Sequence, residues 1–224
     1  MSTLLCIQSW AGAKDHVFAM WQSYQTSGMD IWITCPVNSF HELPAGCKFS
    51  DRIGNEGWLT HEMIKRWVAA WEHFLDDPKF KQYDDMFMCP FDVLFVRKPP
   101  PHPGGLVTHL AGGKLNQGER TGTFYHPPWW ADREAAKVIV RSGRQFMADG
   151  IWELNAPDVF LGYIIEQSKL PWKPANVYSV NGGMMQARLG EACDQIRAGI
   201  WFLHGVINAD QRDILLAAIP KDEH

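Results

Sequence analysis

The sequence predicts a single α/β domain with a mostly parallel central sheet flanked by helices. Apolar runs without alternation at 4–7 and 30–35 are typical of strands that a parallel sheet buries on both faces. Between them, apolar residues at helical spacing end at Gly28, so the chain opens with a β-α-β unit. The length of 224 residues suits one large domain, which we divide into a half at 1–96 and a half at 97–224.

The elements up to residue 123 follow from local patterns. Residues 48–51 are a short strand candidate, and apolar residues at helical spacing predict a helix over 60–75 that begins at a threonine cap. An apolar run at 86–89 predicts a strand, and a second apolar run continues to Val96. The segment 97–123 is rich in proline, glycine and polar residues, so we predict a loop there.

The rest of the chain alternates helical and strand-like patterns. We predict, in order, a helix over 132–142, a helix over 157–167, a strand-like segment over 173–180, a helix over 188–197, an apolar run over 200–206 and a short helix from 209. Asn155 is the expected cap of the helix at 157–167, with Asp158 three residues later in its first turn.

The composition is that of an ordinary globular chain. A net charge of -4 gives no overall basic signature of a nucleic-acid binder, although it leaves room for local basic patches. The five cysteines are odd in number and scattered, which predicts reduced thiols in a cytoplasmic protein. We see no signal peptide pattern and no apolar run of transmembrane length, so we expect no membrane partner.

Three ionisable residues stand among apolar neighbours, where they are costly to bury. Asp92 follows the strand at 86–89, at the kind of strand end where open α/β sheets bind ligands, although aspartate is also common in turns. The dipole of its helix alone would stabilise Asp158. His204 could be a satisfied core histidine. Each residue alone favours its structural alternative, but the three together favour a shared site.

Three segments resemble the nucleotide-sugar glycosyltransferases of the GT-A fold. QYDDMFMCPFDVLF resembles that family's Asp-x-Asp region, ELNAPDVFLGYIIE its acidic motif at a helix start, and WFLHGV its segment with a C-terminal metal-binding histidine. The resemblance implies a Rossmann-like domain in which 1–96 binds the nucleotide and 97–224 forms the acceptor side. The triplet Pro90-Phe91-Asp92 departs from the family pattern, because only its last position keeps an acid.

The resemblance implies a role for each of the three residues. Asp92 and His204 would hold Mn²⁺ or Mg²⁺ on the diphosphate of a nucleotide sugar, most simply a UDP-sugar. Asp158 would be the catalytic base of an inverting enzyme, or would hold the acceptor or the sugar hydroxyls in a retaining one. The missing acid at Pro90 leaves the metal requirement open.

Further residues are candidates for the donor nucleotide. Gln8, Ser9 and Trp10 follow the first strand and Asp51 follows the third, where such folds contact base and ribose. Trp10 could equally fill the core. Arg66, on the helix over 60–75, could meet a phosphate or be an ordinary solvated cation.

The acceptor side has four candidate residues. His126, Trp129 and Trp130 belong to the stretch FYHPPWW, whose indoles could stack on a sugar or a nucleobase, or could pack beneath the following helix. Glu153 is a polar candidate that could be a simple salt-bridge partner.

The sequence therefore predicts a small cytoplasmic glycosyltransferase, in the host cytoplasm if viral, that acts on a hydroxyl acceptor. The acceptor could be a saccharide, a small molecule or a hydroxymethylated base in phage DNA. For DNA, the loop cations Arg97, Lys98, Lys114 and Arg120 would meet phosphates.

Two alternatives stay open. One is a catalytically silent nucleotide- or sugar-binding module, which the missing acid at Pro90 suggests. The other is a different nucleotide-dependent transferase such as a nucleotidyltransferase, for which Asp84 and Asp85 are poorly placed to form a two-metal site.

Overall fold

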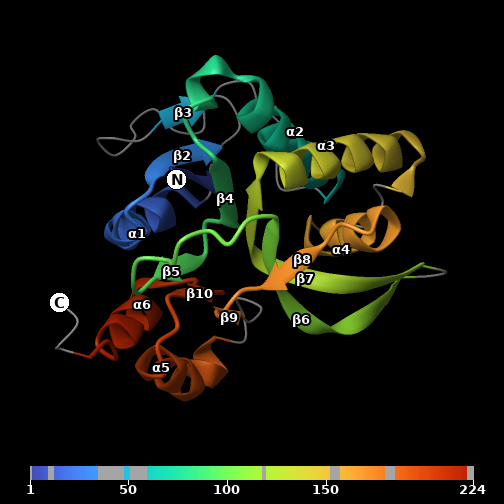
Figure 1. The fold of residues 1–224 in the computed structure, drawn as a ribbon. Coiled ribbons are helices and arrows are strands. Elements are labelled where there is room, and N and C mark those ends of the chain that lie inside the picture. Colours follow the sequence, from blue (N-terminus) through green and yellow to red (C-terminus); the bar gives the residue numbers. More distant parts are fainter. Residues whose placement is uncertain are drawn as a thin grey trace.

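The computed structural model describes residues 2–9, 13–34, 48–50, 60–117, 120–151, 157–179 and 185–220. In chain order the elements are β1 (Thr3–Gln8), α1 (Lys14–Thr26), β2 (Asp30–Thr34), β3 (Lys48–Ser50), α2 (Thr60–Asp76), the 3₁₀ helix η2 (Pro78–Phe80), β4 (Asp85–Pro90), β5 (Val93–Phe95), β6 (Leu106–Gln117), β7 (Arg120–Asp132), α3 (Arg133–Ala148), α4 (Pro157–Ser168), β8 (Trp172–Pro174), β9 (Tyr178–Ser179), the 3₁₀ helix η5 (Gln186–Arg188), α5 (Leu189–Arg197), β10 (Phe202–His204) and α6 (Ala209–Leu216). Figure 1 shows the α/β arrangement, which confirms the predicted fold class.

The main sheet is mostly parallel and reverses its strand order at β1. Among the described residues it has seven strands in the order β3-β2-β1-β4-β7-β6-β8. The strands β3, β2, β1 and β4 are parallel, whereas β7 is antiparallel to both β4 and β6. After β3 the chain returns through α2 to β4, on the other side of β1. Ligands of open α/β sheets bind outside the carboxyl ends of the strands at such a reversal.

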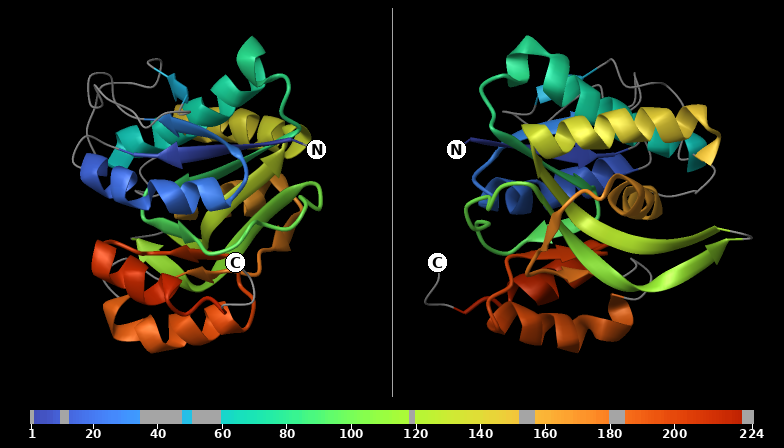
Figure 2. Two further views of the ribbon diagram at one scale, coloured as in Figure 1. Left: turned by 90° about the vertical axis from the view of Figure 1, so that its left-hand side faces the viewer. Right: turned by 45° about the vertical axis from the view of Figure 1, so that its right-hand side comes forward.

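Two apolar cores lie on the two faces of this sheet. Along β1, Leu5 and Ile7 enter the core that contains residues of α1, α5 and α6, whereas Leu4 and Cys6 enter the core that contains residues of α2, α3 and α4. Figure 2 shows α1 on one face and α2 and α3 on the other. A leucine or isoleucine side chain contributes about 1.5–3 kcal/mol to the stability of the fold when it is fully buried. This two-sided burial explains why β1 is apolar without alternation.

The prediction of a loop over 97–123 is wrong for most of that segment. Residues 97–105 lack helix and strand, but β6 begins at Leu106 and pairs with β7 as far as Gln117 opposite Arg120. Figure 2 shows the end of this ribbon extending beyond the body of the molecule. Backbone hydrogen bonds between two strands do not require apolar alternation, so the polar, glycine-containing composition concealed the ribbon.

The other predicted elements lie close to their expected positions. The helix predicted from 132 is α3, and the Asp132 carboxylate caps it by accepting from the Ala135 N–H at 2.9 Å. The strand-like segment at 173–180 forms two short strands, β8 and β9. No helix in the part of the chain that the structure describes is long and apolar enough to cross a membrane.

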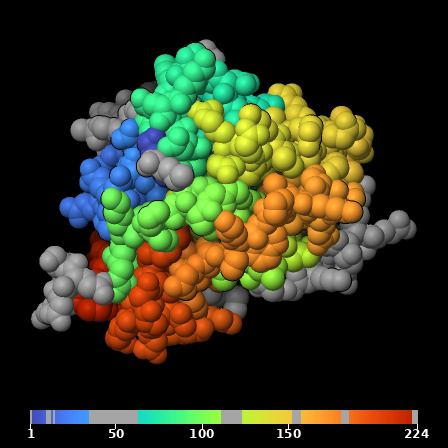
Figure 3. Space-filling model, viewed as in Figure 1, coloured from blue at the N-terminus to red at the C-terminus, as the bar shows by residue number. Residues whose placement is uncertain are grey.

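A second, smaller sheet joins distant parts of the chain. Its order is β5-β10-β9, with β10 antiparallel to β5 and parallel to β9. Figure 3 shows the segment that carries α4 and β8 crossing one face of the molecule from the side of α3 to the C-terminal part. This crossing brings β9 beside β10, next to the segment that follows β4.

Candidate functional site

The small sheet brings together Asp92, Ser179 and His204. Asp92 immediately precedes β5, and its backbone carbonyl accepts from the Gly205 N–H at 2.8 Å and from the Val206 N–H at 3.0 Å. His204 and Ser179 are paired residues of β10 and β9. Nε2 of His204 lies 3.6 Å from Oδ1 of Asp92. The segment after His204 therefore holds Asp92 beside the imidazole.

The main sheet and α4 supply a second pair of the same kind. His126 lies on β7 and Asp158 in the first turn of α4, with Nε2 of His126 3.7 Å from Oδ2 of Asp158. The helix can approach β7 closely because Gly162 has no side chain: a Cβ there would be 2.0 Å from the Thr123 carbonyl oxygen. This close approach positions Asp158 against His126.

Ser179 joins the two pairs into one cluster. Its Oγ lies 2.9 Å from Nδ1 of His126 and 2.9 Å from Nδ1 of His204. We call Asp92, His204, Ser179, His126 and Asp158 the five-residue cluster. The exposed fractions of its imidazole and carboxylate side chains are 11–20%, so the cluster is mostly enclosed but not sealed from solvent. The structure thus brings the three predicted residues, Asp92, Asp158 and His204, to one place.

Burial shifts the pKa of two residues of the cluster, His126 and Asp158. It lowers the pKa of His126 to about 4, assisted by the nearby His204 and His109, so the His126 ring is neutral near pH 7. Burial raises the pKa of Asp158, and the N–H of Val159, which donates to Oδ1 at 3.0 Å, opposes that rise. The raised pKa makes the Asp158 carboxylate a stronger base than an exposed aspartate.

The candidates on the nucleotide side lie at the carboxyl end of β1. Gln8 is the last residue of β1 and is paired with Pro90 of β4, so the two strands end level with each other. Arg66 is buried, and its guanidinium donates to the Ser9 carbonyl at 2.7 Å. Arg66 is therefore not a solvated surface cation. It fixes the chain at the reversal point, where a ligand crevice is expected.

Several candidates cannot be placed. Trp10, Asp51 and Glu153, together with the expected helix cap Asn155, lie outside the described residues. Nothing in the structure bears on their predicted roles.

Trp129 and Trp130 are buried core residues, which agrees with the packing alternative for these two indoles. Trp129 is buried, its indole N–H donates to the Tyr125 carbonyl at 2.7 Å, and its ring meets Trp67 edge to face. Trp130 is also buried, and its indole N–H donates to Asp85 Oδ1 at 2.6 Å. Of the three aromatic candidates, only His126 belongs to the five-residue cluster.

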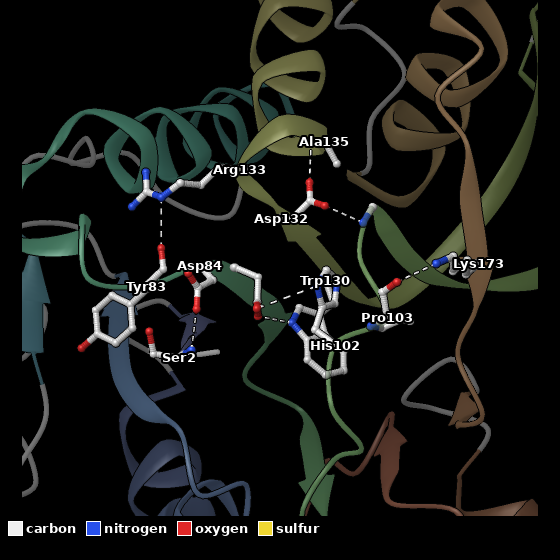
Figure 4. Close-up of polar contacts among 12 residues, drawn as sticks. Ser2, Tyr83, Asp84, His102, Pro103, Trp130, Asp132, Arg133, Ala135 and Lys173 are labelled. Atoms are coloured by element: carbon white, nitrogen blue, oxygen red, sulfur yellow. Dashed lines mark hydrogen bonds and ion pairs between the residues drawn. The ribbon is translucent and has the colours of Figure 1, made fainter.

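A second group of polar residues lies at the amino end of β4. Asp85 and His102 are 1% and 2% exposed, with His102 Nδ1 3.8 Å from Asp85 Oδ2. Figure 4 shows His102 against the Trp130 ring, and the ring centroids are 4.7 Å apart. A pocket of about 800 Å³ is lined by Lys98, His102 and neighbouring residues. We call Asp85, His102 and Trp130 the amino-end group.

Sequence reasoning missed three residues near the five-residue cluster. Ser179 lies in the unremarkable stretch NVYSV, which carries no functional signal. His109 is opposite His126 on β6, inside the segment predicted as a loop, so recognition of the ribbon would have found it. His16 of α1 packs edge to face against Phe91, with ring centroids 5.4 Å apart. Burial lowers the pKa of His16, and the charge of Asp92 opposes that shift.

The donor set fits a metal ion only in part. Among the described residues, no group of three or more histidine, cysteine, aspartate or glutamate side chains could hold a metal ion. The pair Asp92 and His204 supplies one carboxylate and one imidazole 3.6 Å apart, which is a reasonable separation for two ligands of one cation. Mg²⁺ commonly binds through one or two carboxylates and takes other ligands from substrate phosphates and water. Two side chains alone do not complete a metal site, so a cation here would need its other ligands from a bound diphosphate and water.

Comparisons of the chain with protein-family models and with curated proteins gave no match. We therefore infer function from the geometry of the five-residue cluster.

Proposed function

We propose that this protein is a glycosyltransferase that moves a sugar from a nucleotide sugar, most simply a UDP-sugar, to a hydroxyl acceptor. The observation that supports the proposal is the convergence of Asp92, Asp158 and His204, which are far apart in the sequence. Asp92 lies 3.6 Å from His204 and Asp158 lies 3.7 Å from His126, and the Ser179 hydroxyl hydrogen-bonds to both imidazoles. The cluster includes Asp92, just beyond the carboxyl end of β4 beside the strand reversal, where α/β sheets bind their ligands.

The two ends of the cluster suit the two halves of such a reaction. Transfer breaks the bond between the anomeric carbon and a diphosphate oxygen and forms a bond to the acceptor oxygen, whose proton must be removed. In an inverting course Asp158 takes that proton, and its raised pKa suits a base. The Val159 N–H holds the Asp158 carboxylate, and the ring of His126 lies 3.7 Å from it.

At the other end, Asp92 and His204 would hold Mn²⁺ or Mg²⁺ together with the diphosphate. When bound there, the cation supplies positive charge to the oxygens of the leaving group. Gln8 and Ser9 at the end of β1, fixed by Arg66, are the proposed contacts for the nucleotide.

The acceptor proposal is narrower than the sequence alone suggested. The Arg97 guanidinium donates to the carbonyls of Ile196 at 2.9 Å and Ile200 at 2.7 Å, so its hydrogen bonds are directed inside the protein. Lys98 lines the pocket next to the amino-end group. These contacts give no support to a DNA backbone at this loop, and we propose a saccharide or a small hydroxyl compound as the acceptor.

The nucleotidyltransferase alternative is not supported by the contacts of its acids. Asp84 Oδ2 accepts from the Ser2 N–H at 2.9 Å, and Asp85 is buried against Trp130. Both residues lie at the amino end of β4, whereas Asp92 lies beyond its carboxyl end. They do not form the open, paired site that two-metal chemistry needs.

Release of UDP from a panel of UDP-sugars, with and without Mn²⁺, tests the proposal. We expect turnover that needs a divalent cation, and a loss of at least about 100-fold in Asp92→Asn, because the carboxylate at the leaving group is removed. Asp84→Asn, at the opposite end of the same strand, is the matched control and should retain turnover. Calorimetric binding of UDP without turnover of any donor would instead identify a silent nucleotide-binding module.

A further inference from the structure

A pocket of about 800 Å³ lies at the amino ends of the strands β1, β2 and β4. Its wall includes Thr3 and Asp30, the first residues of β1 and β2, and Tyr83, which precedes β4. A pocket of this volume can hold a small organic molecule. Because Asp92 follows the opposite end of β4, the pocket is separate from the five-residue cluster.

The pocket has a closed inner wall and a polar outer part. Tyr83, His102 and Trp130 are buried and form the inner wall, where Figure 4 shows His102 against the Trp130 ring. Lys98 and Asp30 are exposed residues that line the same pocket. Charged contacts with a bound molecule would therefore come from Lys98 and Asp30.

Lys98 is held in place at its backbone and along its stem. Arg97 before it donates to two backbone carbonyls at 2.7 and 2.9 Å, and Pro99 after it has a fixed φ. The stem crosses Gly28, with its Cε and Cδ 3.4 and 3.7 Å from the place that a Cβ of residue 28 would occupy. Among the residues that the structure describes, none forms an ion pair or a hydrogen bond with the Lys98 ammonium. The ammonium is therefore available to an anion.

The Asp30 carboxylate is also held in place. It accepts a hydrogen bond from the hydroxyl of Tyr83. Tyr83 is 3% exposed, and Figure 4 shows its backbone carbonyl accepting from Nε of Arg133, at 3.0 Å. This support orients the carboxylate at the start of β2 before any ligand binds.

Lys98 and Asp30 carry opposite charges at one pocket without forming an ion pair with each other. A molecule with both charges satisfies both residues, its carboxylate bound to the Lys98 ammonium and its ammonium bound to the Asp30 carboxylate. A phosphate dianion fits less well, since the Asp30 carboxylate repels it. Met29 and the proline run 99–101 add apolar surface to the same wall, which suits an apolar side chain.

We propose that this pocket binds a zwitterion, an amino acid with an apolar side chain, through Lys98 and Asp30. The site is additional to the proposed glycosyltransferase site, and binding there makes and breaks no covalent bond. His102 and Trp130 take no part beyond closing the inner wall.

Isothermal titration of the wild-type protein with L-phenylalanine tests the site. N-acetylphenylalanine lacks the ammonium and phenylalaninamide lacks the carboxylate. We expect the free amino acid to bind at least about 10-fold more tightly than either blocked form, because each loses one charge-assisted hydrogen bond. Equal binding of a blocked form would overturn the proposal, whether or not any variant folds. So would a lack of binding of phenylalanine, leucine and methionine at millimolar concentration.

Two variants test the two contacts. Lys98→Met keeps the stem and removes the ammonium, and Asp30→Asn keeps an acceptor for the Tyr83 hydroxyl and removes the charge. Each should weaken phenylalanine binding about 10-fold. Unchanged binding in either variant, at a wild-type melting temperature, would overturn the proposal. Lys137→Met, whose ammonium pairs with Glu134 on α3 at 2.6 Å, is the matched control and should bind as the wild type does.

Asp92→Asn separates this site from the proposed function. Because Asp92 lies beyond the other end of β4, this variant should lose turnover and still bind phenylalanine. A wild-type protein that turns over a nucleotide sugar but binds no amino acid would contradict only the pocket, and the reverse result would contradict only the glycosyltransferase. Loss of phenylalanine binding in Asp92→Asn but not in Lys98→Met would move the amino acid to the five-residue cluster and overturn the assignment to the pocket.

Discussion

The two ends of β4 carry similar residues in different surroundings. Beyond its carboxyl end, Asp92 faces His204, whose other nitrogen bonds to Ser179, and the pair is 16% and 13% exposed. At its amino end, Asp85 faces His102, and both are almost fully enclosed. An aspartate beside a histidine therefore does not by itself indicate a functional site.

Exposure and packing distinguish the two places. The five-residue cluster is connected by hydrogen bonds through Ser179, and its carboxylate side chains are 16% and 20% exposed. In the amino-end group, the Trp130 indole covers His102 and donates to Asp85. We therefore propose a chemical role for the first and a stabilising role for the second, and variants can test this division.

The largest effect should come from Asp158→Asn. Loss of a general base typically lowers kcat by about 10²–10⁴-fold, and the amide retains a similar shape, so the melting temperature should change little. UDP release and thermal unfolding measure the two properties. Turnover close to the wild-type value would contradict the role of Asp158.

Trp130→Phe should have the largest effect on stability at the amino-end group. It removes the indole N–H that serves the buried Asp85 carboxylate, and an unpaired buried acceptor costs about 1–3 kcal/mol beyond the lost packing. Trp129→Phe is the matched control, because its indole N–H serves only a backbone carbonyl. Denaturant unfolding should show the greater loss for Trp130→Phe. An equal loss would mean that the bond to Asp85 adds nothing.

Gly162→Ala should lower both the stability of the protein and its turnover. The added methyl would lie 2.0 Å from the Thr123 carbonyl oxygen, so α4 must move away from β7, at a cost of about 1–3 kcal/mol. That movement separates Asp158 from His126 and should lower kcat as well. Gly190→Ala is the control, because a Cβ there has nothing within 4 Å. Unchanged unfolding and turnover in Gly162→Ala would show that the close approach is not needed.

The smallest effect should appear in the pH dependence of stability. The pKa of His126 is lowered to about 4 from an ordinary value near 6.5, so between these values the unfolded chain binds a proton that the folded chain does not. Stability should therefore fall as pH decreases from about 6.5 to about 4. With partial solvent access allowed for, the loss is about 1–2 kcal/mol.

His126→Asn should flatten this slope. Asp158, whose pKa is raised, acts in the opposite sense, so the difference between the variant and the wild type isolates the histidine. Chemical unfolding at a series of pH values measures it. Parallel stability profiles would rule out His126 as the source of the slope.

Much of the fold was predictable because apolar burial leaves a pattern along the chain. The unbroken apolar run of β1 and the helical spacing of α2 have this origin. The β6–β7 ribbon was not predictable in the same way, since its backbone pairing leaves no such pattern in the composition.

The site was predictable where a polar residue interrupts an apolar segment. Asp92, Asp158 and His204 met that condition, and the structure brings them together. Ser179 did not, because a serine in a short strand is common and its importance comes only from two rings contributed by other strands. The sequence left two alternatives open for Trp130, because an indole in a ligand pocket and an indole in a core look the same in sequence.

Because β10 lies between β5 and β9, the small sheet can form only late in synthesis on the ribosome. The only neighbour of β5 among the described strands is β10, whose residues Phe202–His204 are made about a hundred positions after Phe95. At about 5–20 residues per second, the edge of β5 stays uncovered for roughly 5–20 s in each nascent chain. Asp92 meets His204 only after that interval, so a chain that terminates early lacks the cluster however well its first half has folded.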